Sequence, residues 1–391
     1  MSISSHSGLT DSRELADFGA RVRRLRVSRG LGQIDLAELL KMSSGSISMV
    51  ENGTATVSAD LVERLAGALD CRASYLLEPE PVLKVSRPML RAYADASKKA
   101  VDAIQADTVI AVEAMLRLAL RRVPLQLPLF EGDLSDEDEI ERFALEIRGL
   151  AGLAADEVVD SSIRRVEKVG VVVLPMDSEM GRHLGMSMWV EDVPVIRVSR
   201  SSLDPVHAVP GDRQRFTIAH ELGHLVLHHD RPQPATPAEA SRVEREAHRF
   251  ASAFLAPGDA VVADLEYFGS RVTLSTLEKM KSKWGLSIKA FVVRFRQLGV
   301  IDDDHARSLY KQISARKWNK AEPVLVRNED ASWLRRSIEH FGSPRPEPMR
   351  VASDALGISL GDLSRWTNWT PAPESGTVVD LAAVRRARQG R

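Results

Sequence analysis

The chain has 391 residues, of which 44% are hydrophobic and 27% are charged, and its formal net charge is −1. Such values are ordinary for globular proteins and exclude a fibrous or mainly disordered chain, while the length leaves room for two or three domains. The balanced charge argues against a protein coated in nucleic acid, and no apolar run approaches the roughly 20 residues that a membrane-spanning helix needs.

Two further features predict the compartment. The N-terminal stretch lacks the basic and apolar regions of a signal peptide. The single cysteine, Cys71, excludes an intrachain disulfide and a thiolate zinc site, and its apolar surroundings predict a buried side chain. We therefore expect a cytoplasmic protein with no membrane partner.

Residues 12–78 are predicted to form a domain of short amphipathic helices. Apolar residues recur at helical spacing from Phe18, and a second helix follows a glycine-containing break at Gln33. A third short helix is expected to begin at a serine cap near Ser43 and to end before Gly53. The other face is expected to carry arginines, since the stretch from Phe18 to Ile34 has five of them and no acid: Arg21, Arg23, Arg24, Arg26 and Arg29.

The segment from Phe18 to Leu77 resembles the lambda-repressor-like (XRE) helix-turn-helix family over its full length. The residues that carry the resemblance are Gln33, Leu36, Ala37, Ile47, Val50, Glu51, Asn52, Gly53, Leu65, Ala66 and Leu69. The resemblance implies a five-helix domain that binds duplex DNA through the major groove and the flanking phosphates. The residues it places at the DNA are Arg23, Arg24, Gln33, Ser43, Ser44, Gly45, Ser46 and Met49.

The predicted recognition helix departs from the usual chemistry of base reading. It has no arginine, lysine, asparagine or glutamine before Asn52, so bidentate contacts to bases are unavailable. We therefore expect modest affinity per chain, and specific binding by a homodimer or higher homo-oligomer. Two alternatives stay open: the arginines form a solvated charged face, or the domain binds protein in place of DNA.

Residues 79–139 are expected to be a helical linker with an acidic end. Apolar residues recur near helical spacing within 88–122, and because strict heptads are missing, a packed helix is favoured over a dimer coiled coil. Residues 131–141 (EGDLSDEDEIE) are interpreted as a solvated linker.

Residues 140–260 are predicted to mix helices with a few strands. A helical stretch over 140–168 precedes three expected strands, at 169–175, 186–190 and 194–199. Two further helices are expected at roughly 213–229 and 239–255, separated by a proline-rich loop.

The first of these two helices carries a metal-binding pattern, RFTIAHELGHLVLHH at 215–229. His220 and His224 are four residues apart, so both imidazoles project from one helix face and can bind one ion. Glu221 lies beside that face, where a carboxylate can take a proton from a water that zinc has made acidic. The alternative is a pair of buried, hydrogen-bonded histidines without a metal.

A catalytic zinc site needs a third protein ligand. Asp230 is not expected to serve, because a leucine occupies the place of the glycine turn that would present it. Glu244 follows His224 by 20 residues, a spacing found in zinc proteases with a glutamate ligand. Glu246 lies about 200° round the helix from Glu244 and is expected to be solvated. We therefore predict His220, His224 and Glu244 as ligands of one zinc per chain.

The segment from about 140 to 300 resembles the ImmA/IrrE family of metallopeptidases, on the stretches 215–224 and 244–257. The roles that the resemblance implies are zinc ligation by His220, His224 and Glu244 and general-base catalysis by Glu221. His248 departs from the family, which usually has asparagine there. The implied fold is mainly α with a small β-sheet (α+β), comprising the helix-turn-helix domain, a zincin-like metallopeptidase domain and a helical C-terminal region.

The rest of the chain is predicted to be helical. Residues 261–318 would form a helix-turn-helix-like extension, with helices inside 274–296 and a turn at Trp284–Ser287. Residues 319–372 would form a small bundle, and 373–391 a flexible basic tail. The apolar residues assigned to the bundle are Trp333, Leu334, Phe341, Leu356, Leu360, Leu363 and Trp366.

Together these features predict a regulatory zinc metalloendopeptidase that binds DNA and cleaves a protein, a transcriptional repressor by the family resemblance. The alternative is a transcription regulator whose zinc domain is a sensor or a structural module without turnover. An oxyanion-stabilising donor is also needed, and the sequence does not choose among its candidates. Those candidates are His207, His228, His229 and Tyr267.

Overall fold

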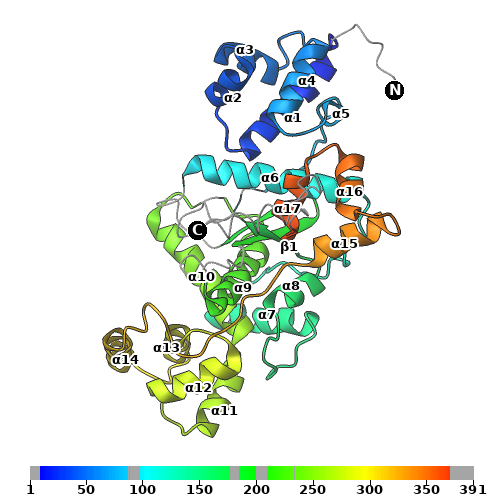
Figure 1. The fold of residues 1–391 in the computed structure, drawn as a ribbon. Coiled ribbons are helices and arrows are strands. Elements are labelled where there is room, and N and C mark those ends of the chain that lie inside the picture. Colours follow the sequence, from blue (N-terminus) through cyan, green and yellow to red (C-terminus); the bar gives the residue numbers. More distant parts are fainter. Residues whose placement is uncertain are drawn as a thin grey trace, which may run out of the picture.

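A computed structural model describes residues 9–86, 88, 97–176, 185–199, 209–232 and 234–369. Helices dominate these ranges, and the one named sheet within them has three strands, so the α+β class expected from the sequence is correct. Figure 1 shows three tiers, with the N-terminal helices at one end, the sheet in the middle and a helical layer beyond it. None of the described helices combines the length and the apolar character needed to cross a membrane.

The N-terminal domain consists of helices α1 to α5. Their bounds are α1 Ser12–Ser28, α2 Gln33–Leu40, α3 Ser44–Glu51, α4 Ala59–Ala68 and α5 Ala73–Leu76. Asp11, Ser43 and Ser58 begin α1, α3 and α4 by accepting hydrogen bonds from backbone N–H groups of the first turn. Phe18 and Ile47 lie in the core of this domain, as the apolar spacing predicts.

The central sheet has the order β1-β3-β2. β3 (Val193–Ser199) pairs parallel with β1 (Val172–Met176) and antiparallel with β2 (Gly185–Val190), which is an edge strand of the sheet. Alternate residues face two separate cores, so Val173 and Ile196 meet the helices on one side while Val172 and Val195 face the other. Both sheet faces are therefore covered.

One face of the sheet is covered mainly by α9 (Gly211–Leu227), which contacts β2 and β3, and by α8 (Ser162–Lys168), which contacts β1. α10 (Pro237–Leu255) packs on α9 and on α7 (Glu137–Leu150). Helices α11 (Gly258–Tyr267), α12 (Leu274–Trp284), α13 (Ile288–Gln297) and α14 (Asp303–Ala315) continue this layer. Gly285, in the predicted turn between α12 and α13, has φ +70°, a conformation that glycine adopts without strain.

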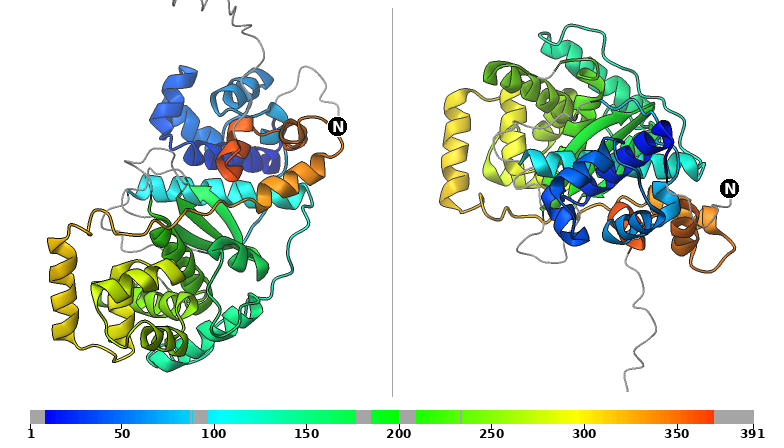
Figure 2. Two further views of the ribbon diagram at one scale, coloured as in Figure 1. Left: turned by 60° about the horizontal axis from the view of Figure 1, so that its bottom comes forward. Right: turned by 90° about the horizontal axis from the view of Figure 1, so that it is seen from above.

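The opposite face is covered by α6 and by the C-terminal helices, which also contact the N-terminal domain (Figure 2). α6 (Lys98–Arg117) packs along α1, while α15 (Trp333–Gly342), α16 (Pro348–Leu356) and α17 (Leu360–Thr367) share one apolar core with both. Ile358 forms a β-bridge with Cys71, and the Arg72 N–H donates to the Gly357 carbonyl at 2.8 Å. The C-terminal helices thus contact both the N-terminal domain and the sheet.

Several local expectations need correction. The acidic stretch is not all linker, because α7 begins at Glu137, where acidic residues stabilise the positive end of a helix. The helical stretch over 140–168 is two helices with a connection between them. Cys71 is only partly buried, and Phe341 is 41% exposed. The expected tail at 373–391 lies outside the described residues, and the domain boundaries stay predictions.

Candidate metal centre and DNA-binding surface

Helix α9 presents two histidines toward α10. The helix buries Ile218, Leu222 and Leu225 in the core below the sheet, and this fixes the direction in which its other faces point. At Gly223 the helices come so close that an added Cβ would lie 3.1 Å from a ring atom of Phe250. The close approach brings α10 carboxylates within reach of the α9 imidazoles.

His220, His224 and Glu244 converge. The Nε2 atoms of the two histidines lie 3.0 Å apart. The Glu244 carboxylate oxygens lie 3.4 Å from His220 Nε2 and 3.6 Å from His224 Nε2. A tetrahedral zinc ion with bonds of about 2.0–2.2 Å holds its ligand atoms about 3.3–3.6 Å apart. The two distances to Glu244 fall in this range and the distance between the two nitrogens is slightly below it, so two imidazoles and a carboxylate fit zinc in donor type and closely in spacing.

The electrostatics of the three residues suit a cation. Burial lowers the pKa of His220 to about 3, with His224 adding to the effect, so the imidazole is neutral at physiological pH. Burial by itself would raise the pKa of Glu244, but hydrogen bonds and charge interactions with His220 and His224 hold it below its ordinary value. The site therefore offers a neutral imidazole at His220 and a charged carboxylate at Glu244.

Glu221 lies next to this group and outside it. Its carboxylate accepts a hydrogen bond from Ser187 Oγ at 2.7 Å, and burial raises its pKa to about 7. Gly185 in the same strand leaves room for it, since an added Cβ there would lie 2.9 Å from Glu221 Cγ. A buried carboxylate with a raised pKa is suited to accepting and returning a proton.

Ser187 was not among the predicted site residues. It stands between Gly185 and Trp189 on the face of β2 that meets α9, where the Trp189 indole N–H donates to the Leu225 carbonyl at 3.3 Å. Period-two alternation in the strand could have placed a serine on this face, but the pairing with Glu221 depends on packing between distant segments.

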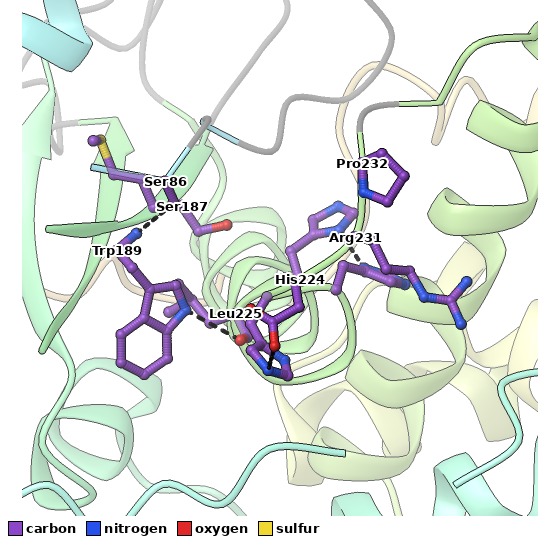
Figure 3. Close-up of a pocket in the computed structure, with 11 residues that line it drawn as sticks. Ser86, Ser187, Trp189, His224, Leu225, Arg231 and Pro232 are labelled. Carbon is purple, nitrogen blue, oxygen red and sulfur yellow. Dashed lines mark hydrogen bonds and ion pairs between the residues drawn. The ribbon is translucent and has the colours of Figure 1, made fainter. Parts of the chain in front are cut away.

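A cavity of about 520 Å³ lies beside the centre (Figure 3). It runs between β2 and the C-terminal end of α9, and its lining includes one of the three candidate ligands, His224, together with Ser187. The other lining residues are Ser86, Met188, Trp189, Leu225, His228, His229, Asp230, Arg231 and Pro232. The cavity has the size of a small-ligand or side-chain pocket.

The other candidates from the sequence are distributed as follows. Asp230 is exposed and pairs with His229, away from the three converging residues. Tyr267 is 84% exposed on α11, and His207 lies outside the described residues. The ring of His248 lies 4.6 Å from that of His220, which keeps it near the centre.

The position of Glu246 differs from the one expected from the sequence. It was expected to be solvated, but it is buried and its Oε2 lies 2.9 Å from His228 Nε2. His228 follows His224 by one further helical turn at the end of α9, and it is the buried partner of Glu246 on α10.

The predicted DNA contacts fall into two groups. Arg23 is exposed, as are Ser43, Ser44 and Met49 at the start of α3 and along it, while Ser46 is partly buried. Arg24 instead pairs with Glu113 of α6 at 3.2 Å and with Glu80, which lies in the segment between α5 and α6.

Gln33 and the remaining arginines of α1 also have partners inside the protein. Gln33 Nε2 donates to Glu51 Oε2 at 2.8 Å. The ion pairs of the other three join Arg21 to Glu113, Arg26 to Glu51 and Arg29 to Asp362. The basic face predicted from the sequence is therefore largely an internal ion-pair surface.

Two segments of the chain match known family models. Residues 166–296 match the peptidase M78 model, described as the IrrE N-terminal-like domain, and residues 17–73 match a helix-turn-helix domain model. No curated protein is matched by the chain. The chain thus combines a metallopeptidase-like domain with a helix-turn-helix domain, which confirms both resemblances seen in the sequence.

Proposed function

We propose that this protein is a regulatory zinc metalloendopeptidase that binds DNA through its N-terminal domain. The observation that carries the proposal is the convergence of His220, His224 and Glu244 with Glu221 beside them. Three ligands leave one position of a tetrahedral ion open, which is the arrangement of catalytic zinc sites. The match of this region to a peptidase family supports the same reading.

Peptide hydrolysis at this site would need a Lewis acid, a proton acceptor and a group that positions that acceptor. Zinc, when bound, supplies a Lewis acid that polarises a peptide carbonyl and makes water more acidic. Glu221 would accept the proton of the attacking water and return it to the leaving amine. Ser187 would hold the Glu221 carboxylate in place until the substrate arrives, through the hydrogen bond of 2.7 Å.

The substrate would be an extended segment of another protein. β2 is an edge strand, and an extended peptide can add to such an edge through backbone hydrogen bonds. The chain itself already pairs there at one end, where Val85 bridges to Val190. The cavity between β2 and α9 would take a substrate side chain.

The N-terminal domain would bring this activity to DNA. Helix α3 lies on the side of that domain turned away from α6 and the sheet, so the peptidase region does not cover it (Figure 1). A DNA-bound transcriptional repressor is the substrate class that fits a peptidase located at an operator. Because base contacts are limited to hydroxyls and a methionine, we propose that a homo-oligomer binds the DNA.

Zinc binding tests the proposal. The purified native chain is expected to hold about one zinc per chain, measured by elemental mass spectrometry against protein concentration. His220→Ala, His224→Ala and Glu244→Ala should each lose most of the metal at limiting zinc. Glu266→Ala, which removes an exposed carboxylate on α11, is the matched control and should keep it. Zinc retained in the Glu244→Ala protein would refute the ligand assignment.

A further inference from the structure

A second buried pair lies directly behind one of the proposed ligands. His224 Nδ1, the nitrogen that points away from Glu244, lies 3.0 Å from His228 Nδ1. His228 Nε2 in turn lies 2.9 Å from Glu246 Oε2. His228 and Glu246 are both buried, so the three residues form a continuous polar chain inside the α9–α10 interface.

Only one arrangement of protons satisfies this chain when His224 Nε2 offers its lone pair to a cation. His224 must then carry its proton on Nδ1 and donate it to His228 Nδ1. His228 must carry its own proton on Nε2 and donate it to the Glu246 carboxylate. The carboxylate at the end thus selects the tautomer of both imidazoles.

We infer that His228 and Glu246 are positioning residues that fix the tautomer and orientation of His224 and so set the zinc affinity of the site. The inference rests on the proposed function, because it assigns residues that act on the metal through a proposed ligand. A carboxylate behind a ligating imidazole also makes that imidazole a better donor. In this chain the carboxylate acts through an interposed histidine.

The two proposed histidine ligands would then differ in how their Nδ1 atoms are held. His220 Nδ1 is buried, and among the described residues no hydrogen-bond partner faces it. His224 is held from behind by His228 and Glu246, whereas His220 is held by packing against Phe216 and His248. The inference therefore places the main control of affinity on the His224 side.

The test is a zinc titration of the full chain. The dissociation constant is measured by competition with a chelator of known affinity for the native protein, Glu246→Gln and His228→Phe. Glu246→Gln keeps the shape of the side chain and removes its charge, and His228→Phe keeps the volume and breaks the chain of hydrogen bonds. Loss of such partners typically weakens metal affinity about 10–100-fold, and that weakening is expected in both variants. The double variant should be little weaker than His228→Phe, since Glu246 acts on His224 only through His228.

The controls separate an effect on the metal from simple packing. Arg242→Ala removes the exposed partner of Glu246 Oε1, 3.6 Å away, and should leave the zinc affinity unchanged. The melting temperatures of the metal-free proteins report packing alone, and the absorption spectrum of the Co²⁺-loaded proteins reports ligand geometry. If His228→Phe does not fold, the zinc affinity of the near-isosteric Glu246→Gln still tests the inference.

Zinc affinity within twofold of native in a folded Glu246→Gln protein, with an unchanged Co²⁺ spectrum, would overturn the inference. Failure of the native chain to bind zinc would instead overturn the proposed function. The two failures are therefore distinguishable.

Discussion

At the scale of single residues, the candidate centre separates binding from proton transfer. Glu244 meets both histidines, whereas Glu221 is turned toward Ser187 and is not among the converging ligand atoms. Substituting Glu221 should therefore leave the metal in place, and this makes the two roles experimentally separable.

The sequence pattern identified the local part of this centre. His220, Glu221 and His224 belong to one helix, and helical periodicity alone relates their positions. The choice between Glu244 and Glu246 depended on how α10 packs on α9, and the spacing to His224 favoured the residue that the structure brings to the histidines. Ser187 comes from a strand far away in the sequence, so no local pattern indicates it.

A buried carboxylate away from the centre gives a pH prediction. Glu167 on α8 is buried, and burial raises its pKa to about 7, with Arg336 lowering it and Glu329 raising it. Because its ordinary pKa is about 4.3, the folded protein holds more protons than the unfolded chain between about pH 4.3 and 7, and stability falls as pH rises through that window.

Glu167→Gln removes this penalty. The variant is expected to be more stable than the native protein at pH 8, by ~4 kcal/mol at most, and the gain should vanish near pH 4. Urea unfolding of both proteins at pH 4, 6 and 8 measures the difference. A gain that stays the same at all three pH values would exclude titration of Glu167 as its cause.

At the scale of secondary-structure elements, α1 is both a core helix and a connector. Arg21 and Arg24 meet Glu113 of α6, and Arg29 meets Asp362 of α17. The arginines were interpreted as a DNA-facing patch, but the acidic partners of Arg21, Arg24 and Arg29 lie more than 50 residues away in sequence. A local charge count cannot reveal partners at such distances.

The two neighbouring arginines of α1 should therefore behave differently. Arg23→Ala is expected to weaken DNA binding by the full chain and to reduce the slope of log affinity against log salt by about 1, as loss of one phosphate contact does. Arg24→Ala should leave that slope unchanged and instead lower the melting temperature, because Glu80 and Glu113 each lose one of their arginine partners. Titrations at several salt concentrations with DNA from the gene's own locus measure the slopes. Equal slope changes in the two variants would show that Arg24 also binds phosphate.

The sequence predicted the bounds of helices and strands better than it predicted which of them contact each other. Caps and apolar spacing predicted α2, α3, β2 and β3 to within a residue or two, because those signals are local. The start of α7 was missed, since an acidic run is typical both of a solvated loop and of a first helical turn. Leu134 and Ile140, which are buried, are the apolar signal that separates the two.

At the scale of the whole molecule, buried and partly buried charges connect the helix-turn-helix domain to the sheet. Arg29 pairs with Asp362, Asp362 also meets Arg365, and Arg365 lies 3.5 Å from Asp107. Asp107 in turn pairs with Arg197 of β3 at 2.8 Å. This chain of charges crosses four segments that are far apart in sequence, so composition and motifs could not predict it. It joins the N-terminal domain to the strand beside β2.

The central claim is that the chain hydrolyses a protein with Glu221 as its base, and one comparison tests it most directly. Native protein and Glu221→Gln are each expressed in cells that carry the gene's own locus but lack the native copy, and new protein N-termini are mapped under conditions in which the target gene is regulated. Glutamine keeps the shape of the side chain but cannot accept a proton, so a loss of about 10²–10⁴ in rate is expected. At least one new N-terminus should appear with the native protein and be absent with Glu221→Gln, while zinc content and DNA binding stay equal. Identical N-termini and equal regulation in both would contradict the account and favour a zinc-containing transcription regulator without turnover.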